Sequence, residues 1–425
     1  MSFELLIMVG TLFLLSGIGI PIAYAIIVAS MAYMLAAGAS IGIVGKTLTD
    51  GIYQSFLLLA VPLFIVAANI MNAGTISDRL LNFCIATVGR FKGGLGHVNV
   101  MASLIFSGMS GSAVGESAGN GKVIIGVVRH VGRIAAGSSP AITAASATIG
   151  PIIPPSIPMV LYALVSNASV GALFLGGILP GLLMGAVLMA MNSWISHRRG
   201  FATEAPVPFR DLPRVTGRAF PALLMPAILL YGIYGGVTTP TEAAAVAAAY
   251  ALLLSAVFYR SLRMKTLYMI LVESARSSAA VGIVIGGALI LNYIVASENI
   301  PAALAAHLVD VDVSPLTFLL AVSALVLVLG CLLDATTIIL VIVPLFIPAC
   351  NLLGIDLVHF GVVIVVNCMI GLITPPYGIL LFVINAVTGI PLRDIIRDVV
   401  PFLVVLLAAL LAMILIPDIV LFLPR

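Results

Sequence analysis

Charge is what this chain of 425 residues has least of. Only 8% of its residues are Asp, Glu, Lys or Arg and 62% are hydrophobic, whereas a soluble domain carries about 25% charged residues. This deficit excludes an ordinary soluble protein. Several apolar runs exceed the roughly 20 residues that a helix needs to cross a bilayer. The main runs are Leu5–Leu35, Phe56–Met71, Val170–Ile195, Leu316–Leu333 and Val399–Ile416. We therefore expect an all-α polytopic membrane protein.

Several other features are missing. No Lys or Arg precedes Lys46, so the basic region of a secretory signal is lacking, and we expect the first apolar run to be a retained helix. The stretch "GNGKV" lacks the final Ser or Thr of a phosphate-binding loop, so no ATP site is visible. The four cysteines have no metal-ligand spacing and are expected to be packing residues. They are Cys84, Cys331, Cys350 and Cys368.

The few basic residues are unevenly distributed. Five arginines lie between His197 and Arg218, and a second group contains Arg260, Arg263 and Lys265. The positive-inside rule places both loops in the cytoplasm. Two apolar segments separate these loops, so the chain crosses the membrane twice between them and both loops lie on the same side. Because the basic loops are short and tied to helices, they indicate membrane topology and not a nucleic-acid partner.

The chain contains a repeated motif. When the first half is shifted by 221 positions (370 − 149), "IGPIIPP" at Ile149–Pro155 falls on "IGLITPP" at Ile370–Pro376, and Pro180 falls on Pro401. Transporters are often built from two inverted repeats. We therefore predict a first half-repeat over residues 1–196, a polar cytoplasmic linker over 197–218 and a second half-repeat over 219–425.

Each repeated motif has a small, polar cluster upstream of it. "FSGMSGSAVGES" covers residues 106–117 and "GCLLDATT" covers residues 330–337. Such sequence is too polar for a lipid-facing helix, but it suits the tip of a re-entrant hairpin that is buried in protein. We predict hairpin 1 over about residues 96–130 and hairpin 2 over about 315–350. Proline interrupts helices, so broken helices are expected at 149–158 and 370–376.

The two breaks predict a chemistry. Where a helix is interrupted, carbonyl oxygens lose their partners and become available to a small cation, and the helix that follows presents a partly positive N-terminus to an anion. Two symmetric breaks thus suggest two cation sites around one anion site. Glu116 and Asp334 are carboxylates within apolar hairpins, which makes them functional candidates. The alternative for both is a helix end near the membrane interface.

Two further motifs have simpler interpretations. "GESAG", at residues 115–119, matches the nucleophile pattern of serine hydrolases, but no strand precedes it and the pattern needs Asp and His partners. "TPTE", at Thr239–Glu242, predicts a capping box that opens a helix at Ala243. A substrate-binding role for Glu242 is the alternative.

At these residues the sequence resembles a known family. "GMSGSAV", "ITAASATIGPIIPPSIPMVLYAL", "LFLGGILPGLLMG", "TPTEAAAVAA", "FGVVIVVNCMIGLITPP" and "GIPIAYA" are similar to the large membrane (M) subunit of tripartite ATP-independent periplasmic (TRAP) transporters. The resemblance covers nearly the whole chain. It implies an inverted-repeat, elevator-type carrier in the bacterial inner membrane that takes up organic acid anions together with Na⁺. It also implies a small four-helix membrane (Q) subunit as a separate chain and a periplasmic substrate-binding protein.

The resemblance implies two Na⁺ sites. One would lie between the tip at Ser110–Ser112 and the break at Gly150–Pro155, and the other between Gly330–Asp334 and the break at Gly371–Pro376. The expected Na⁺ ligands are Ser110, Ser112, Gly150, Ile153, Pro155, Gly330, Asp334, Gly371, Thr374 and Pro376. The expected substrate-binding residues are Ser110, Ser112, Glu116, Pro155, Asp334, Thr374 and Pro376. The family usually has Asp after its "SGSAVA" motif, whereas this chain has Gly115–Glu116, and the longer acid can alter the first site.

Three alternatives stay open from the sequence. A stand-alone divalent-anion/Na⁺ symporter of related architecture would work without partners. An ion channel would show conductance without saturable exchange, and a membrane-embedded hydrolase would depend on Ser117. The repeat and the paired breaks favour a carrier. The substrate stays open among C4-dicarboxylates, sialic acids, keto acids and sugar acids.

Overall fold

A computed structural model describes residues 2–54, 56–73, 76–117, 138–199, 211–310 and 312–425. This part of the chain is helical and contains no strand. The first half contains α1 (Phe3–Gly17), α2 (Ile22–Ala36), α3 (Gly42–Gln54), η1 (Phe56–Leu59), α4 (Ala60–Ala73), α5 (Ile76–Val88), α6 (Gly94–Ser110), α8 (Ser138–Ala147), α9 (Ile157–Ser166) and α10 (Val170–Arg199). The second half contains α11 (Leu212–Tyr234), α12 (Pro240–Leu253), η2 (Leu254–Phe258), α13 (Met264–Ser297), α14 (Ile300–Asp310), α15 (Pro315–Leu332), α16 (Ala335–Thr337), η3 (Ile338–Ile342), η4 (Val343–Leu345), α17 (Ile347–Leu352), α18 (Leu357–Gly371), α19 (Ile379–Thr388), α20 (Leu392–Leu415) and α21 (Asp418–Leu421).

Six helices of the described chain are long and apolar enough to cross a membrane, or seven spans if the bent pair 56–72 and 76–88 forms one. They are Val170–Arg199, Leu212–Tyr234, Pro240–Phe258, Met264–Ser297, Pro315–Leu332 and Leu392–Leu415. The prediction of an all-α polytopic membrane protein is confirmed. All four cysteines are buried and unpaired.

The first apolar run forms two helices and not the one helix that we expected, and in this respect the prediction was wrong. Two helices of 15 residues each, α1 and α2, occupy it and pack against each other. The chain reverses between them, where Gly19 has a φ of +88° that favours glycine and Pro21 precedes the first residue of α2. Each helix alone is shorter than the roughly 20 residues of a membrane span.

Helix boundaries recur at the spacing of the repeated motif. Adding 221 to the bounds of α6 gives 315–331, and α15 covers Pro315–Leu332. The same addition moves α9 to 378–387, and α19 covers Ile379–Thr388. The start of α10 moves to 391, one residue before the start of α20. In both halves the Pro–Pro bond of the motif, Pro154–Pro155 and Pro375–Pro376, is cis.

One long helix distinguishes the two halves. In the first half α3, η1 and α4 follow one another as separate helices. Their bounds plus 221 fall almost entirely within α13, which runs unbroken for 34 residues. α13 contacts α4 along part of its length and α2 along another part, so a single helix of the second half links helices of the first half.

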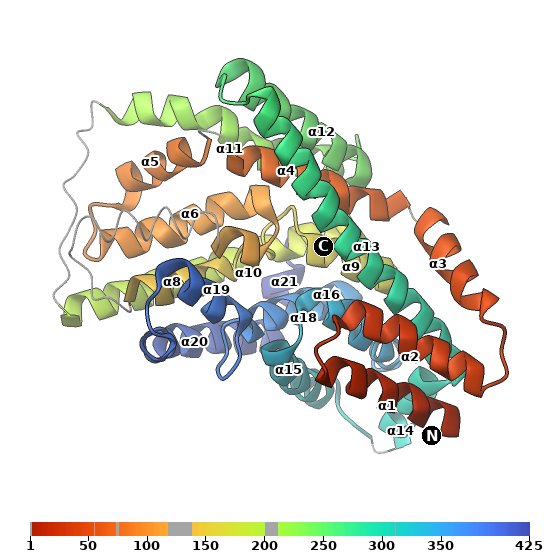
Figure 1. Ribbon diagram of the computed structural model, residues 1–425. Helices are drawn as coiled ribbons and strands as arrows, with labels where there is room; N and C mark the ends of the chain where they lie inside the picture. The colour runs from red at the N-terminus through yellow and green to blue at the C-terminus, as the bar shows by residue number, and fades with distance from the viewer. Residues whose placement is uncertain (1, 55, 74–75, 118–137, 200–210, 311) are drawn as a thin grey trace.

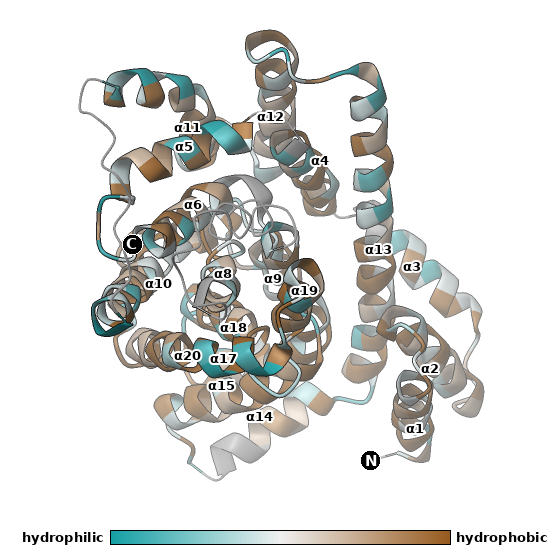
Figure 2. Ribbon diagram, turned by 60° about the vertical axis from the view of Figure 1, so that its left-hand side comes forward, coloured by the Kyte–Doolittle hydropathy of each residue, from teal (hydrophilic) through white to brown (hydrophobic). Residues whose placement is uncertain are grey.

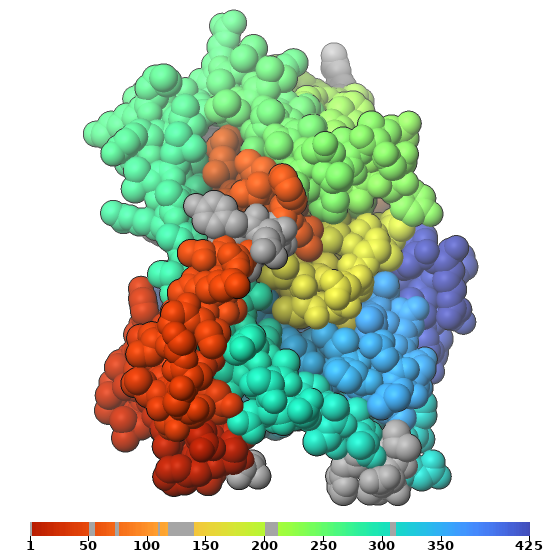
Figure 3. Space-filling view, turned by 90° about the vertical axis from the view of Figure 1, so that its right-hand side faces the viewer, coloured from red at the N-terminus to blue at the C-terminus, as the bar shows by residue number. Residues whose placement is uncertain are grey.

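The helices form a rounded body and an arm beside it (Figure 1). The body contains α6, α8 to α10 and α15 to α21, and α18 lies at its centre, with every residue from His359 to Gly371 buried. α11, α12 and α4 cover one side of this body, and α13 leads from them toward α1 to α3. In Figure 2 the helices α13, α3, α2 and α1 form a column next to the body. Figure 3 shows the same separation on the molecular surface, with N-terminal and C-terminal helices on opposite sides of one face.

Buried polar contacts fasten each hairpin to its own broken helix. Asn99 on α6 donates to the Thr143 hydroxyl on α8 and accepts from Ser146. In the second half Asn367 on α18 donates to the carbonyl oxygen of Ser323 on α15 at 2.6 Å. Positions 146 and 367 are again 221 residues apart. Buried polar groups stabilise a fold when they are paired, so these contacts fix the hairpin arms against the breaks.

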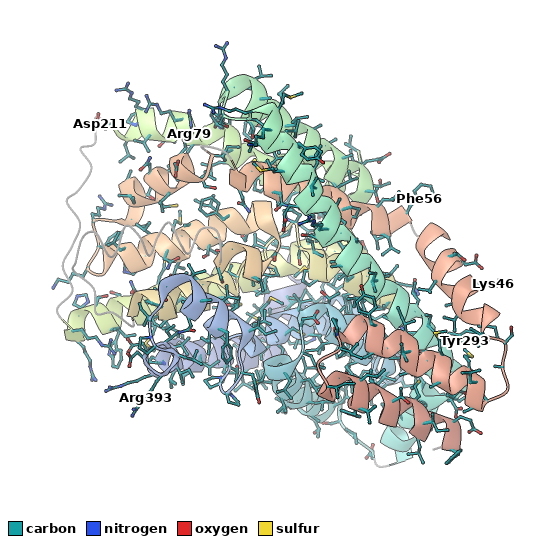
Figure 4. The ribbon with its side chains drawn as sticks, in the orientation of Figure 1. Lys46, Phe56, Arg79, Asp211, Tyr293 and Arg393 are labelled. Carbon is teal, nitrogen blue, oxygen red and sulfur yellow. The ribbon has the colours of Figure 1, made fainter. Side chains whose placement is uncertain are left out.

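The basic segments lie on shared edges of the molecule. The Tyr259 hydroxyl donates to the carbonyl oxygen of Arg218 at 3.0 Å, which brings the second basic loop to the start of α11. The Arg79 guanidinium lies 4.1 Å from the centroid of the Tyr259 ring, where α5 meets α11 (Figure 4). An ion pair of 3.0 Å joins Arg199, at the end of α10, to Asp398 near the start of α20. Arg393 extends away from the body at that end (Figure 4). The structure therefore places the second basic loop beside the end of the first, as the even number of crossings requires.

Candidate functional site

The tip of hairpin 1 follows α6 directly. α6 ends at Ser110, and Gly111 has a φ of +55°, which turns the chain toward a second arm that begins at Ala113. Ser112 caps this arm, because its hydroxyl accepts from the N–H of Gly115 at 3.3 Å. The Ser110 side chain and residues 118–137, which include Lys122 and Val127–Arg133, lie outside the described residues.

Gly111 brings the tip against the first break. A β-carbon on Gly111 would lie 2.9 Å from the carbonyl oxygen of Pro155, which is closer than real β-carbons approach backbone. α8 ends at Ala147 and α9 begins at Ile157, so the helix is interrupted as the sequence predicts. Within the described chain no N–H or hydroxyl donates to the carbonyl oxygens of Gly150, Ile153 or Pro155. The first break thus offers three carbonyl oxygens without a donor among the described residues, and that of Pro155 lies against the tip of hairpin 1.

Glu116 lies behind the tip. Its side chain is 3% exposed, and its Oε2 atom has no hydrogen-bond partner among the described residues. A β-carbon on Gly150 would lie 2.6 Å from this Oε2 atom, so the carboxyl group rests on the backbone of the break. The glycine at position 150 therefore leaves the room that the longer acid needs.

Hairpin 2 places Asp334 at its tip. α15 ends at Leu332, and Asp334 is the N-cap of the next arm, which begins with α16. One carboxylate oxygen accepts from the N–H of Thr337 at 3.1 Å, and the other accepts from the Thr337 hydroxyl at 2.6 Å. This capping role explains why an acid opens the arm, and it holds the carboxylate in one orientation.

The second break touches hairpin 2 through glycine. α18 ends at Gly371 and α19 begins at Ile379. A β-carbon on Gly371 would lie 2.7 Å from the backbone of Gly330 and 3.0 Å from its carbonyl oxygen. The Thr374 hydroxyl donates to the carbonyl oxygen of Ile370 at 2.8 Å. In the described chain the carbonyl oxygens of Gly330, Thr374 and Pro376 receive no donor.

A cavity of about 480 Å³ lies where the two tips meet. Residues 111–115 of hairpin 1 and 334–336 of hairpin 2 line it, together with Pro151 of the first break and Leu372 of the second. The first residues of α9 and α19 also face it. Helix N-termini carry partial positive charge, so the cavity combines the features expected of an anion site.

The opposite wall of this cavity comes from α4 and α13. Asn69 and Ile65 belong to α4, and Glu273, Ser277 and Val281 belong to α13. Close to the wall, the Asn69 side chain donates to the Ser274 hydroxyl at 2.9 Å and joins the two helices. These polar residues were not predicted from the sequence. The one signal that could have found them was Glu273, an acid within a candidate membrane span.

The predicted site residues fall into three groups. Ser112 and Asp334 line the central cavity. Glu116 lies behind the tip of hairpin 1 against Gly150 of the first break, and Pro155 of the same break contacts the tip; neither is among the cavity-lining residues. Thr374 and Pro376 line a second, apolar cavity of about 400 Å³ that they share with α15 and Tyr377.

Two simpler interpretations can also be compared with the structure. The capping box at Thr239 is confirmed: its hydroxyl accepts from the N–H of Glu242, and the Glu242 carboxylate accepts from the N–H of Thr239 at 2.7 Å. Ser117 of the hydrolase-like pattern is buried, and its hydroxyl has no partner among the described residues.

Comparison with known proteins gives a consistent result. The family model described as "Tripartite ATP-independent periplasmic transporter, DctM component" matches residues 9–419. The chain is 39% identical, over 98% of both chains, to a sialic acid TRAP transporter large permease protein of Vibrio cholerae. It is 36% identical to a C4-dicarboxylate TRAP transporter large permease protein of Pseudomonas aeruginosa, over 88% of this chain and 87% of the other. Among solved structures, the YdaH transporter of Alcanivorax borkumensis has the same fold, with a TM-score of 0.59 at 16% identity over 87% of this chain and 86% of that one.

Proposed function

Since the chain belongs to the DctM component family of tripartite ATP-independent periplasmic transporters, and that family is a transporter component and not an enzyme, we propose that it is the large permease subunit of such a transporter. It takes up an organic acid anion across the bacterial inner membrane, and the inward Na⁺ gradient drives the transport. The observation that carries this proposal is the cavity between the two hairpin tips, which both breaks and two helix N-termini face.

Two Na⁺ sites follow from the unpaired carbonyl groups. Na⁺ is a small, hard cation, and carbonyl oxygens that are freed where a transmembrane helix unwinds can coordinate it. The first site uses carbonyl oxygens of Gly150, Ile153 and Pro155 beside the tip at Ser110–Ser112. The second uses the carbonyl oxygens of Gly330, Thr374 and Pro376 with the carboxylate of Asp334. The carbonyl oxygen of Gly371, which also accepts from the N–H of Thr374 at 3.0 Å, is the remaining ligand. The contact of each tip with its own break supports both assignments.

The substrate carboxylate binds between the tips in this proposal. Ile157 and Ile379, the first residues of α9 and α19, both face the cavity. A bound Na⁺ on either side adds positive charge where the two N-termini are directed. Ser112 and Asp334 complete the polar surface, and Glu116, Pro155, Thr374 and Pro376 support the substrate site from behind the tips.

An elevator-type movement follows from the two-part architecture. We infer that the body, with both hairpins and both breaks, moves against α4, α11, α12 and α13. The site then crosses the membrane with the body while the wall formed by α4 and α13 stays in place. The two half-repeats, 1–196 and 219–425, supply one hairpin and one break each, which is supported by the helix boundaries that recur 221 residues apart.

Two partners complete the transporter in this proposal. The chain covers 98% of the Vibrio cholerae relative, whose name describes a large permease protein. In this proposal a small four-helix membrane subunit binds as a separate chain, and a periplasmic binding protein delivers the anion. These partners are proteins, and no nucleic acid is involved.

Reconstitution tests this function. Proteoliposomes containing the chain and its small subunit should accumulate the labelled organic acid only when the binding protein and an inward Na⁺ gradient are both present. Uptake should depend on Na⁺ concentration more steeply than first order, and choline should not replace Na⁺. Strong uptake by the purified chain alone would instead indicate a stand-alone symporter. Uptake that follows a pH gradient and ignores Na⁺ would rule out the two sodium sites.

A further inference from the structure

The charge on the cavity wall is opposite to what an anion site requires. Glu273 of α13 and Asp334 of hairpin 2 both line the cavity. None of the described residues that line it is Lys, Arg or His. The positive charge in the cavity therefore comes only from the N-termini of α9 and α19 and from bound cations. The α13 side of the cavity carries a carboxylate.

Glu273 differs from Asp334 in how it is held. Both oxygens of Asp334 accept hydrogen bonds from Thr337. The Glu273 side chain is exposed and one helical turn from Ser277, which lines the same cavity. Asn69, also on this wall, provides a further amide group. This wall thus offers a carboxylate, a hydroxyl and an amide to whatever fills the cavity.

From this arrangement we propose that Glu273 determines substrate specificity. It selects a monocarboxylate whose other end carries hydrogen-bond donors, such as hydroxyl, amide or ammonium groups, and it rejects a dicarboxylate. The proposal rests on the proposed function, because it assigns the substrate carboxylate to the end of the cavity where α9 and α19 begin.

The physical basis is discrimination by charge. A carboxylate of Glu273 accepts hydrogen bonds from donors at the far end of the substrate, and charge-assisted hydrogen bonds are about twice as strong as neutral ones. A second carboxylate on the substrate would meet Glu273 as a like charge, and such juxtapositions suppress wrong partners. Because α13 belongs to the arm and not to the body, the selection acts while the cavity of the body lies against this wall.

Binding to the permease alone tests this selection without the specificity of the binding protein. The chain is purified with its small subunit in NaCl, and thermal stabilisation is titrated with N-acetylneuraminate, with gluconate and with succinate. The wild type should be stabilised by at least one of the two hydroxylated monocarboxylates at about tenfold lower concentration than by succinate. In Glu273→Gln this ratio should fall about tenfold, because the side chain keeps its size and loses its charge.

Two further variants complete the experiment. Glu273→Asp keeps the charge and should keep the preference within about threefold. Glu4→Gln removes a carboxylate on α1, which does not line the cavity, and should behave as the wild type. The proposal is overturned if succinate stabilises the wild type at the same concentration as the two monocarboxylates. It is also overturned if none of the three compounds stabilises the protein. An unchanged ratio in Glu273→Gln overturns it too. Na⁺-driven uptake with an unchanged ratio would contradict this selection and leave the proposed function intact.

Discussion

Gly330 and Gly371 touch backbone to backbone: a β-carbon added to Gly371 would lie only 2.7 Å from the Cα atom of Gly330. Gly330 lies in the last turn of α15, the first arm of hairpin 2, and Gly371 ends α18. The contact joins the tip of a hairpin to the break in a helix, and no larger residue fits at position 371. The first variant therefore changes this glycine.

Gly371→Ala should separate hairpin 2 from the second break. Overpacking of this kind costs about 1–3 kcal/mol, and about 1.4 kcal/mol corresponds to a tenfold change in affinity. We expect the Na⁺ concentration for half-maximal uptake to rise about tenfold or more. Gly282→Ala is the matched control, since nothing lies within 4 Å of a β-carbon there. An equal effect of both substitutions would show that the close contact is irrelevant to Na⁺.

Gly150 and Glu116 should behave as a coupled pair. A methyl group at position 150 would lie 2.6 Å from the Oε2 atom of Glu116, so Gly150→Ala should reduce uptake strongly. Glu116→Asp shortens the acid by one methylene group and makes room for the methyl. The double variant should then recover at least part of the lost activity, measured as uptake per correctly inserted protein. A double variant worse than Gly150→Ala would contradict the proposed contact.

Asp334→Asn should separate the charge of Asp334 from its capping role. Asparagine is as good an N-cap as aspartate, so the midpoint of thermal unfolding should change little while the half-saturating Na⁺ concentration rises about tenfold. Asp356→Asn is the control, because Asp356 caps α18 by accepting from the N–H groups of Val358 and His359. The charge has no part in Na⁺ binding if both variants leave the Na⁺ dependence unchanged.

Ser112→Ala tests the tip of hairpin 1. Loss of a hydroxyl that pairs buried polar groups costs about 1–3 kcal/mol, so the apparent Na⁺ affinity should fall several-fold to about a hundred-fold. Ser314→Ala is the matched control, since Ser314 caps α15 through the N–H of Thr317 and does not line the cavity. The measurement is the Na⁺ dependence of uptake. Equal curves for Ser112→Ala and the wild type would remove Ser112 from the first site.

Acid should loosen the junction between α2 and the end of α13. The hydroxyl of Tyr33 donates to Glu298 at 2.6 Å and that of Ser2 at 3.0 Å, and these bonds lower the pKa of Glu298. Because the pKa of Glu298 is lower in the folded protein, its ionised carboxylate stabilises the fold above the ordinary pKa of 4.5. This stabilisation is lost as the pH falls through the pKa that Glu298 has in the folded protein. Hydrogen exchange of α1 and α2 should therefore be constant from pH 7 to about pH 5 and accelerate, after correction for intrinsic rates, in more acid solution.

Tyr33→Phe provides the comparison for this pH dependence. It removes the shorter of the two hydrogen bonds to Glu298, so the α1–α2 pair should be less protected at pH 7. Its remaining change between pH 7 and acid should be smaller than in the wild type. Identical pH profiles in the two proteins would show that the Tyr33–Glu298 bond does not hold the pair.

The breaks and hairpin tips could be predicted from sequence because their signals are local. Proline and glycine are clustered at 149–158 and 370–376, and both helix interruptions are present. Single prolines such as Pro180 and Pro401 lie inside continuous helices. The capping box at Thr239 is equally local. The reversal at Gly19–Pro21 also had a local signal, because it contains a glycine and a proline. The apolar residues on both sides of it nevertheless led us to predict one helix.

The cavity wall could not be predicted because its residues meet through tertiary packing. Asn69 and Ser274 are 205 positions apart and hydrogen-bond across two helices. Whether the Glu116 side chain faces the cavity or is buried also depends on tertiary packing. Ser112 and Glu116 belong to one small polar cluster in the sequence, yet Ser112 faces the cavity and Glu116 is buried against Gly150. No pattern of residue types separates these two positions.

The unbroken length of α13 has a mechanical consequence. At 1.5 Å per residue its 34 residues span about 51 Å, whereas the hydrocarbon core is about 30 Å thick. The helix can match this thickness only by leaning steeply or by projecting into the headgroups, and in Figure 1 it crosses the other helices obliquely. A thicker or thinner bilayer would change the tilt angle of α13. Because α13 is continuous, α2 at one end and α4 at the other would tilt together with it as one rigid unit. Lipid chain length thereby acts directly on the wall that carries Glu273.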